Sequence, residues 1–160
     1  MSDNKMRVVL REVDDSDLPV YFEYLRDPEA AAMAGIDPND QHAFQKQWTN
    51  RRRDTESVTR TIEDPESGAV LGYIVGFPDG SDFRVAYWVD REYWGRGVAT
   101  ASLGAFMAEV ERRPVYARAP RQNEAAVVVL KRNGFHLVGE ESGYSAEAGQ
   151  VLDELILRHG

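Results

Sequence analysis

A strand, a glycine-containing turn and a helix follow one another between Val85 and Thr100, and this stretch constrains the fold more than any other part of the chain. It reads V-A-Y-W-V-D-R-E-Y-W-G-R-G-V-A-T, with the β-rich run ending at Val89 and glycines at Gly95 and Gly97 before an amphipathic helix. Such glycines let successive backbone amides face one point at the positive end of the helix dipole, which suits an anion. The stretch therefore predicts a phosphate-binding turn.

The residues around this turn predict the topology. A strand expected at 115–119 follows the helix, so the unit is βαβ and its two strands should run parallel with a right-handed crossover. Strands expected at 57–62 and 69–77, joined by the turn D-P-E-S-G, and the alternating residues at 83–89 predict an antiparallel meander. Further strands are expected at 8–10, 135–140 and 151–157, and helices at about 17–25, 38–53, 98–113 and 124–133. We expect a single α+β domain over residues 1–160, with a mixed, mostly antiparallel sheet of about seven strands and about four helices.

Composition excludes several classes of protein. The chain has 160 residues, no cysteine and a formal net charge of -8. Disulfides, thiolate metal sites and covalent cysteine intermediates are excluded, and no run is long and apolar enough for a membrane span. The charge disfavours nucleic acid and anionic membranes. We therefore expect a soluble, cytoplasmic protein that binds neither, in which an anionic ligand needs a local basic patch. Candidates for that patch gather in the half that holds the glycine turn: Arg91, Arg96, Arg118, Arg121, Lys131 and Arg132.

Familiar catalytic motifs are missing. There is no Walker-type phosphate loop and no G-x-S-x-G nucleophile elbow, and the three histidines are isolated, so no metal site is expected. A dinucleotide fingerprint needs a third glycine, where this chain has Thr100, and an acid at the end of the next strand, where it has Arg118. The glycines could serve a sharp turn alone. Against that alternative stand the converging amides of residues 95–100 and the positive charge of Arg96.

Two segments in sequence resemble a known family. The run Y-W-V-D-R-E-Y-W-G-R-G-V-A-T, followed by N-E-A-A-V-V-V-L-K-R-N-G-F, resembles the GNAT N-acetyltransferases, especially the RimJ/RimL-like branch that acetylates ribosomal-protein N-termini and related amines. The resemblance extends over nearly the entire chain. It implies acetyl transfer from acetyl-CoA to a primary amine, either a peptide N-terminus or a small molecule.

The resemblance also implies a cofactor site. The turn would bind the pyrophosphate of CoA, Trp88 and Val89 would offer main-chain groups to the pantetheine where two parallel strands splay apart, and Asn123 would offer its side chain to the same arm. The turn residues in this set are Gly95, Arg96, Gly97, Val98, Ala99 and Thr100. Because the chain has no cysteine, the amine would attack the thioester directly, within one ternary complex.

The catalytic acid and base that the family often uses are not visible. Arg84 stands where members of the branch often have an acid, Ala126 where many have serine, and Leu130 where peptide N-terminal acetyltransferases often have tyrosine. These departures leave a second hypothesis open, in which a domain of the same fold senses a CoA ester or has lost turnover.

Tyr87 is the catalytic candidate that remains, because it lies on the central strand near the expected thioester. Its alternative role is that of a core aromatic residue. Glu23 and Tyr144 are weaker candidates, in segments expected to border the acceptor cleft. The identity of the acceptor and the choice between monomer and homodimer stay open.

Overall fold

The structure is a computed structural model that describes the backbone of residues 5–145 and 150–160, and the side chains of these residues except 143–145 and 150–152. Its described residues form a seven-stranded sheet in the order β1-β2-β3-β4-β5-β7-β6. Neighbouring strands are antiparallel except for β4 and β5, which are parallel. The strands are β1 (Val9–Arg11), β2 (Val58–Glu63), β3 (Val70–Asp79), β4 (Asp82–Val89), β5 (Val115–Pro120), β6 (His136–Ser145) and β7 (Gln150–His159).

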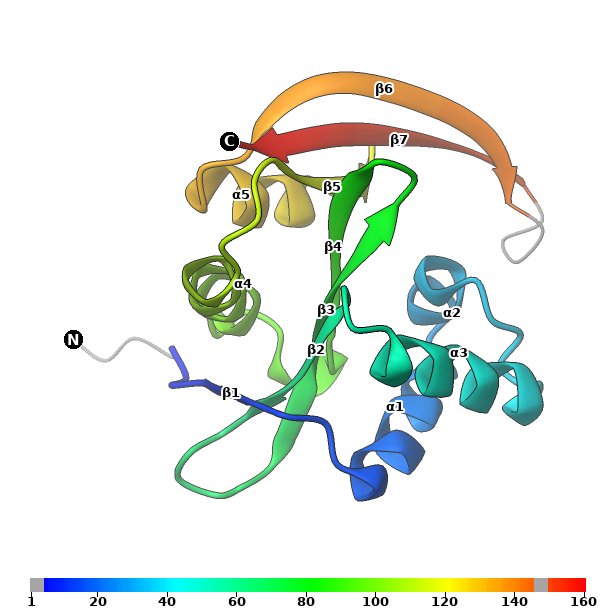
Figure 1. The fold of residues 1–160 in the computed structure, drawn as a ribbon, viewed down its shortest axis with the longest axis vertical. Helices are drawn as coiled ribbons and strands as arrows, with labels where there is room; N and C mark the ends of the chain where they lie inside the picture. The colour runs from blue at the N-terminus through cyan, green and yellow to red at the C-terminus, as the bar shows by residue number, and fades with distance from the viewer. Residues whose placement is uncertain (1–4, 146–149) are drawn as a thin grey trace.

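Helices cover both faces of this sheet. In Figure 1, α4 and α5 lie on one side of the central strands, and α1, α2 and α3 lie on the other. The α-helices are α1 (Leu18–Tyr24), α2 (Pro28–Ala34), α3 (Gln41–Arg53), α4 (Val98–Glu109) and α5 (Glu124–Arg132), with short 3-10 helices η1 (Asp15–Asp17) and η2 (Arg91–Tyr93). The expected single α+β arrangement with a meander and a parallel βαβ unit is confirmed.

The helix α2 is not predicted by the sequence pattern, and its ends explain how it is overlooked. The Asp27-Pro28 pair predicts only an end or break of α1. The Asp27 side chain in fact caps α2 by accepting a hydrogen bond from the Glu29 amide, and Pro28 occupies the first turn. Proline is well tolerated there because its missing N–H would have no partner. Gly35, at φ 67°, then ends the helix.

The alternating side chains of β4 divide the core into two layers. Phe83, Val85 and Val89 pack in the layer under α4 and α5, while Trp88 packs with the aromatic layer under α1 to α3. Neighbouring residues of a strand point to opposite faces of a sheet, so β4 contributes to both layers. The face of a β4 residue therefore decides whether it lies on the α4 side or the α1 side.

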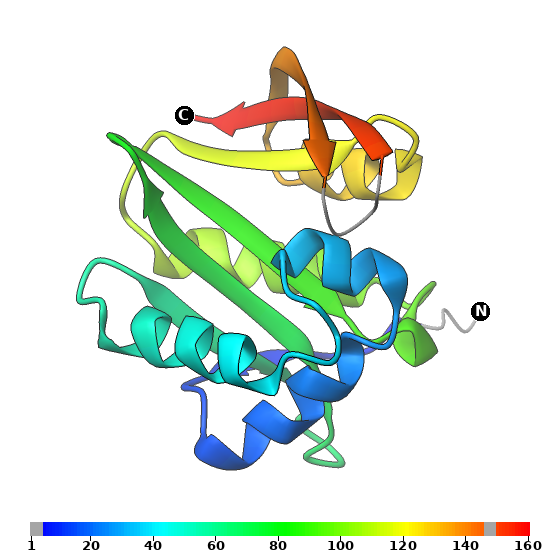
Figure 2. The same cartoon turned by 90° about the vertical axis from the view of Figure 1, so that its right-hand side faces the viewer.

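The two parallel strands separate beyond one bridge. Among the described residues, β4 and β5 are paired only at Arg84 and Tyr116, although β4 continues to Val89 and β5 to Pro120. Figure 2 shows the two strands diverging from that point. The splayed parallel pair implied by the family resemblance is thus present, and it opens beside the glycine turn.

Candidate active site

The glycine turn adopts the conformation expected of an anion-binding turn. Gly95 has φ 80° and Gly97 has φ 74°, a left-handed backbone that residues with a side chain rarely adopt. Gly97 is the N-cap of α4 and supplies no side-chain cap. Within the described part of the chain, none of the amides of residues 95–100 donates a hydrogen bond, and the first bonded amide is that of Ala101, to the Gly97 carbonyl. These amides are free to bind an anion at the positive end of the α4 dipole.

The segment before β1 supports the turn from behind. The Met6 amide donates to the Arg96 carbonyl at 2.9 Å, and an Arg96 guanidinium nitrogen lies 3.7 Å from the Met6 sulfur. The Lys5 side chain lies so close that a Cβ on Gly97 would be 3.5 Å from its Cγ. The side chains of Lys5 and Arg96 therefore both lie next to the glycine turn, on the side of the segment before β1. Lys5 was not among the expected residues, because nothing in its local sequence connects it with the turn.

Three arginines of the expected basic patch are engaged elsewhere. Arg91 contacts Asp27 at 2.5 Å, Arg118 contacts Glu141 at 3.1 Å, and Arg121 pairs with Glu140. Their positive charge is largely matched by these carboxylates. The patch that serves the turn is consequently narrower than the sequence suggested.

The register of β4 decides which main-chain groups face the splay. The Asp90 amide bonds to the Leu71 carbonyl of β3 at 2.8 Å, and Trp88 is paired with Tyr73 of the same strand. Hydrogen-bonded and non-hydrogen-bonded residues alternate in an antiparallel ladder, so the main chain of Trp88 faces β3, while those of Tyr87 and Val89 face β5. This register disfavours the expected contact between the Trp88 main chain and the pantetheine, and that contact stays a prediction. Val89 faces the expected way, and Tyr87 joins it.

Trp94 already occupies the carbonyl of Val89, one of the main-chain groups that face the splay. Its indole N–H donates to the Val89 carbonyl at 2.7 Å, which leaves the Val89 amide and the main chain of Tyr87 facing the splay. The guanidinium of Arg91 stacks 4.0 Å from the Trp94 ring centroid. Trp94 thus ties the end of β4 to the start of the glycine turn.

Asn123 has the position expected of it at the start of α5. Its side-chain oxygen caps the helix by accepting from the Ala126 amide at 3.0 Å. Within the described residues, its side-chain NH₂ has no acceptor. Asn123 therefore combines a structural role with an amide donor that is available to a ligand.

Tyr87 lies on the α4 side of the sheet and packs against the core there. Burial raises the pKa of its hydroxyl, so the group stays protonated at neutral pH. Among the described residues the hydroxyl has no hydrogen-bond partner. Tyr87 is consequently suited to donate a proton or a hydrogen bond and unsuited to act as a base.

A groove on the opposite face lies beside the last residues of β4. It encloses about 460 Å³ and is lined by Val20, Glu23, Tyr24, Arg26, Asp27, Trp88, Asp90 and Arg91. Glu23 lies in it as an exposed side chain paired with Arg26 at 3.1 Å. The Tyr24 hydroxyl is buried without a partner in the described chain. The sequence pattern does not single out Tyr24, because it lies off the apolar helix face formed by Leu18, Tyr21, Phe22 and Leu25. The side chain of Tyr144 lies outside the described residues.

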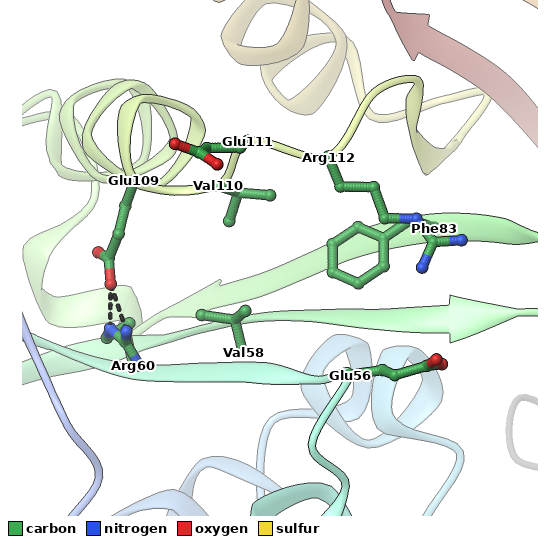
Figure 3. A pocket seen from close by; sticks show the side chains of 8 residues that line it. All are labelled: Glu56, Val58, Arg60, Phe83, Glu109, Val110, Glu111 and Arg112. Atoms are coloured by element: carbon green, nitrogen blue, oxygen red, sulfur yellow. Dashed lines mark hydrogen bonds and ion pairs between the residues drawn. The ribbon is translucent and has the colours of Figure 1, made fainter.

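A second cavity, of about 310 Å³, lies far from the turn. It is formed by the end of α4 and by residues of β2 and β4, and Figure 3 shows Arg60 paired with Glu109 on its wall. The glycine turn lies at the start of α4, and Glu109 is the last residue of that helix. At 1.5 Å per residue, Gly97 and Glu109 are about 18 Å apart. This cavity therefore does not belong to the candidate site at the glycine turn.

Residues 5–145 and 150–160 contain no cluster of three His, Cys, Asp or Glu side chains placed to hold a metal ion. None of the helices in the same residues has the length and apolar character to cross a membrane.

A mixed sheet whose parallel strands splay beside an uncapped, glycine-led helix defines the class of acyl-CoA-dependent acetyltransferases. The chain belongs to the acetyltransferase (GNAT) domain family, whose model matches residues 7–136. A comparison with curated protein sequences found no significant match.

Solved structures agree at the level of the fold. Spermidine N-acetyltransferase from Vibrio cholerae, in complex with CoA and spermine, aligns with a TM-score of 0.81 at 14% identity, over 94% of each chain. Mycobacterium smegmatis RimJ in complex with CoA-disulfide aligns at 0.77 and 24% identity, over 94% of this chain and 80% of that one. RimL, a ribosomal L7/L12 alpha-N-protein acetyltransferase, aligns at 0.75 and 21% identity, over 95% and 89%. The expected likeness to the RimJ/RimL branch is thus confirmed for the fold.

Proposed function

We propose that the protein transfers an acetyl group from acetyl-CoA directly to a primary amine within one ternary complex. The observation that carries this proposal is the set of free amides at residues 95–100, beside the splay of β4 and β5. A pyrophosphate would accept hydrogen bonds from these amides, with Arg96 and Lys5 alongside. The pantetheine would then extend along the main chain of Val89 and Tyr87.

The chemistry follows from the residues present. With no cysteine to carry the acetyl group, the neutral amine attacks the thioester carbonyl, its N–C bond forms and the C–S bond breaks. The nitrogen, cationic after attack, releases one proton to water as the amide forms. The leaving thiolate takes up a proton, and Tyr87 is the proposed donor because its hydroxyl stays protonated; Tyr87 then regains a proton from water. Neighbours of the same fold act on spermidine and on a ribosomal protein N-terminus, so both kinds of amine belong among the first acceptors to test.

Two measurements test this function. Calorimetry should show that acetyl-CoA binds, and a thiol assay should show CoA release when amines and peptides are supplied. Absence of acetyl-CoA binding at millimolar ligand would refute the proposal. A cytoplasmic location and a monomeric or homodimeric state remain predictions.

A CoA-ester sensor of the same fold is the second candidate. It is favoured by the cationic Arg84 on β4 and by the raised pKa of Tyr87, which leave no carboxylate or basic phenolate on this strand near the splay. A sensor would bind acetyl-CoA without releasing CoA for any acceptor. Measurable turnover with one amine excludes it.

Asn123 offers a matched pair of variants for the cofactor site. Asn123→Asp keeps the oxygen that caps α5 but removes the NH₂ donor, so we expect it to weaken CoA binding about tenfold with an unchanged melting temperature. Asn123→Ala removes both groups and should also lower stability by about 1 kcal/mol. Unchanged CoA affinity in both variants, measured by calorimetry, would remove Asn123 from the site.

A further inference from the structure

A row of polar and charged side chains crosses the sheet at the closed end of the splay. Arg84 is paired with Phe77 of β3 on one side and with Tyr116 of β5 on the other. Tyr116 is in turn paired with Arg158 of β7. Directly paired residues project from the same face of a sheet, so Arg84, Tyr116 and Arg158 share one face. This face is the one that α1 to α3 cover, because Phe77 packs with the aromatic layer there.

A third arginine reaches the same place from α3. The guanidinium carbon of Arg51 lies 5.8 Å from the Phe77 ring centroid, and that of Arg84 lies 5.7 Å from it. We call Arg51, Arg84 and Arg158 the arginine cluster. Arg51 and Arg84 meet over the Phe77 ring, and the sheet register places Arg158 on the same face, two strands away from Arg84.

The cluster has hydrogen-bonding capacity that the described protein does not use. Arg51 Nη1, Arg84 Nε and Arg158 Nε are all buried, and none has a partner among the described residues. Burial lowers the pKa of Arg51, and the nearby charge of Arg84 lowers it further. Buried donors without acceptors are costly, and a bound anion would satisfy them.

Few carboxylates compensate this charge. The described partner of Arg84 is Asp79, at 3.5 Å, and that carboxylate is half exposed. Arg118 follows Tyr116 by two residues on β5, and its charge is neutralised by Glu141 at 3.1 Å and Glu154 at 3.8 Å. In a chain of net charge -8, the arginine cluster is therefore a local concentration of positive charge.

The arginine cluster lies on the side of the sheet from which an acceptor would enter, where it could contact a group of the acceptor other than its amine. The bridge between Arg84 and Tyr116 ends the splay along which the pantetheine would run, so the thioester would lie close to it. The cluster shares the α1 side of the sheet with the groove at Trp88. The arginines do not line this groove, so an amine bound in it would extend the rest of the acceptor along the same face toward them.

We propose that the arginine cluster binds a carboxylate of the acceptor, so that the substrate is a primary amine that also carries a carboxylate. This inference rests on the proposed acetyltransferase function. Free amino acids and peptides with an acidic residue near the N-terminus share this chemistry. A polycation such as spermidine would be repelled by the same charges.

Matched acceptors test the proposal. The acceptors are glutamate, a peptide beginning with aspartate, the same peptide with asparagine in its place, and spermidine. We expect the wild-type protein to show a kcat/KM at least tenfold higher for one of the carboxylate acceptors than for the asparagine peptide and spermidine. Preference for glutamate indicates an amino-acid substrate, and preference for the aspartate peptide indicates an acidic N-terminus. Preference for spermidine, or equal rates with all four, would overturn the proposal.

Variants identify the cluster as the origin of this preference. Arg84→Gln should reduce kcat/KM for the preferred carboxylate acceptor about ten- to a hundredfold and leave that for the asparagine peptide nearly unchanged. Arg84→Lys should retain part of the preference. Arg60→Gln, which removes an arginine paired with Glu109 on the α4 side, should leave it intact. An equal loss for every acceptor in Arg84→Gln would contradict a role in carboxylate binding.

A binding experiment separates this proposal from the proposed function. Calorimetry with glutamate and with the aspartate peptide, in the presence of CoA, needs no turnover. Binding to the wild type that Arg84→Gln abolishes would support the carboxylate site even in a protein that released no CoA. Lack of binding by both ligands, in a protein that acetylates other amines, would overturn the site and leave the proposed function standing.

Discussion

Replacing Asp17 with asparagine should lower the free energy of unfolding by about 3–5 kcal/mol, the range found when a buried ion pair loses one partner. The Asp17 side chain is only 3% exposed and accepts both guanidinium N–H groups of Arg11 at 2.8 Å. It also accepts from the Asp14 amide at 2.8 Å and from the Thr61 hydroxyl at 2.7 Å. An asparagine amide cannot accept from all of these donors, so Arg11 would lose the more buried of its two carboxylate partners and keep only Glu63, at 2.8 Å.

Urea denaturation measures this effect, and Asp15→Asn is the matched control. Asp15 is in the same 3-10 helix and also pairs with an arginine, Arg52, at 2.6 Å, but its side chain is 91% exposed. Exposed pairs contribute little because water solvates both charges. Equal stability losses in the two variants would show that burial of Asp17 does not set the effect.

The same residue predicts a pH dependence. Burial alone would raise the pKa of Asp17, but the hydrogen bonds from Arg11, the Asp14 amide and Thr61 outweigh it and hold the pKa below its usual range. Because the folded-state pKa is lowered, the stabilisation is present above the unfolded value of about 3.9 and is lost as the pH falls through the folded pKa. Unfolding curves between pH 5 and pH 2 should therefore converge for wild type and Asp17→Asn.

Local patterns in the sequence were sufficient for most of the sheet. The alternation at 83–89 predicted β4, and the order strand, helix, strand predicted its parallel pairing with β5. The helix α2 was missed although Asp27 and Gly35 mark its ends, because its small, alanine-rich segment has little apolar periodicity. Local signals of this kind are readable where periodicity is strong and are overlooked where it is weak.

On the cofactor side of the candidate site, the structure has the local geometry that the sequence predicts, while the contacts with CoA remain a prediction. The glycine turn and Asn123 are short, contiguous signals, and both occupy the expected positions. The sequence does not reveal which residues of β4 turn their main chain toward β5, and the pairing of Trp88 with Tyr73 favours Tyr87 and Val89 over Trp88. Arg51, Arg84 and Arg158 are far apart in the sequence and share one face of the sheet only through the register of the strands and the packing of α3. No local sequence pattern predicts that such distant residues lie on the same face of the sheet.

The largest expected effect on cofactor binding comes from Gly97→Ala. At φ 74°, an alanine costs roughly 1–2 kcal/mol in the left-handed conformation, although the space around the new Cβ is adequate, with Lys5 Cγ at 3.5 Å. The backbone can relieve this strain only by rotating φ, which turns the amides of Val98 and Ala99 away from their common point. Hydrogen bonds to a charged group contribute about 1.5–3 kcal/mol each, so CoA affinity should fall at least about tenfold.

Gly80→Ala separates the loss of stability from the loss of binding. Gly80 is also left-handed, at φ 64°, and a Cβ added there would meet nothing within 4 Å, but it lies in the β3–β4 turn at the other end of β4 from the glycine turn. Both variants should lose similar stability in thermal melts, and only Gly97→Ala should lose CoA affinity by calorimetry. Equal CoA affinities in the two variants would mean that the amides of residues 95–100 do not bind the pyrophosphate. In that case no pyrophosphate-binding group would be known beside the separated strands β4 and β5, and the proposed acetyl transfer would lose its main support, the free amides of residues 95–100.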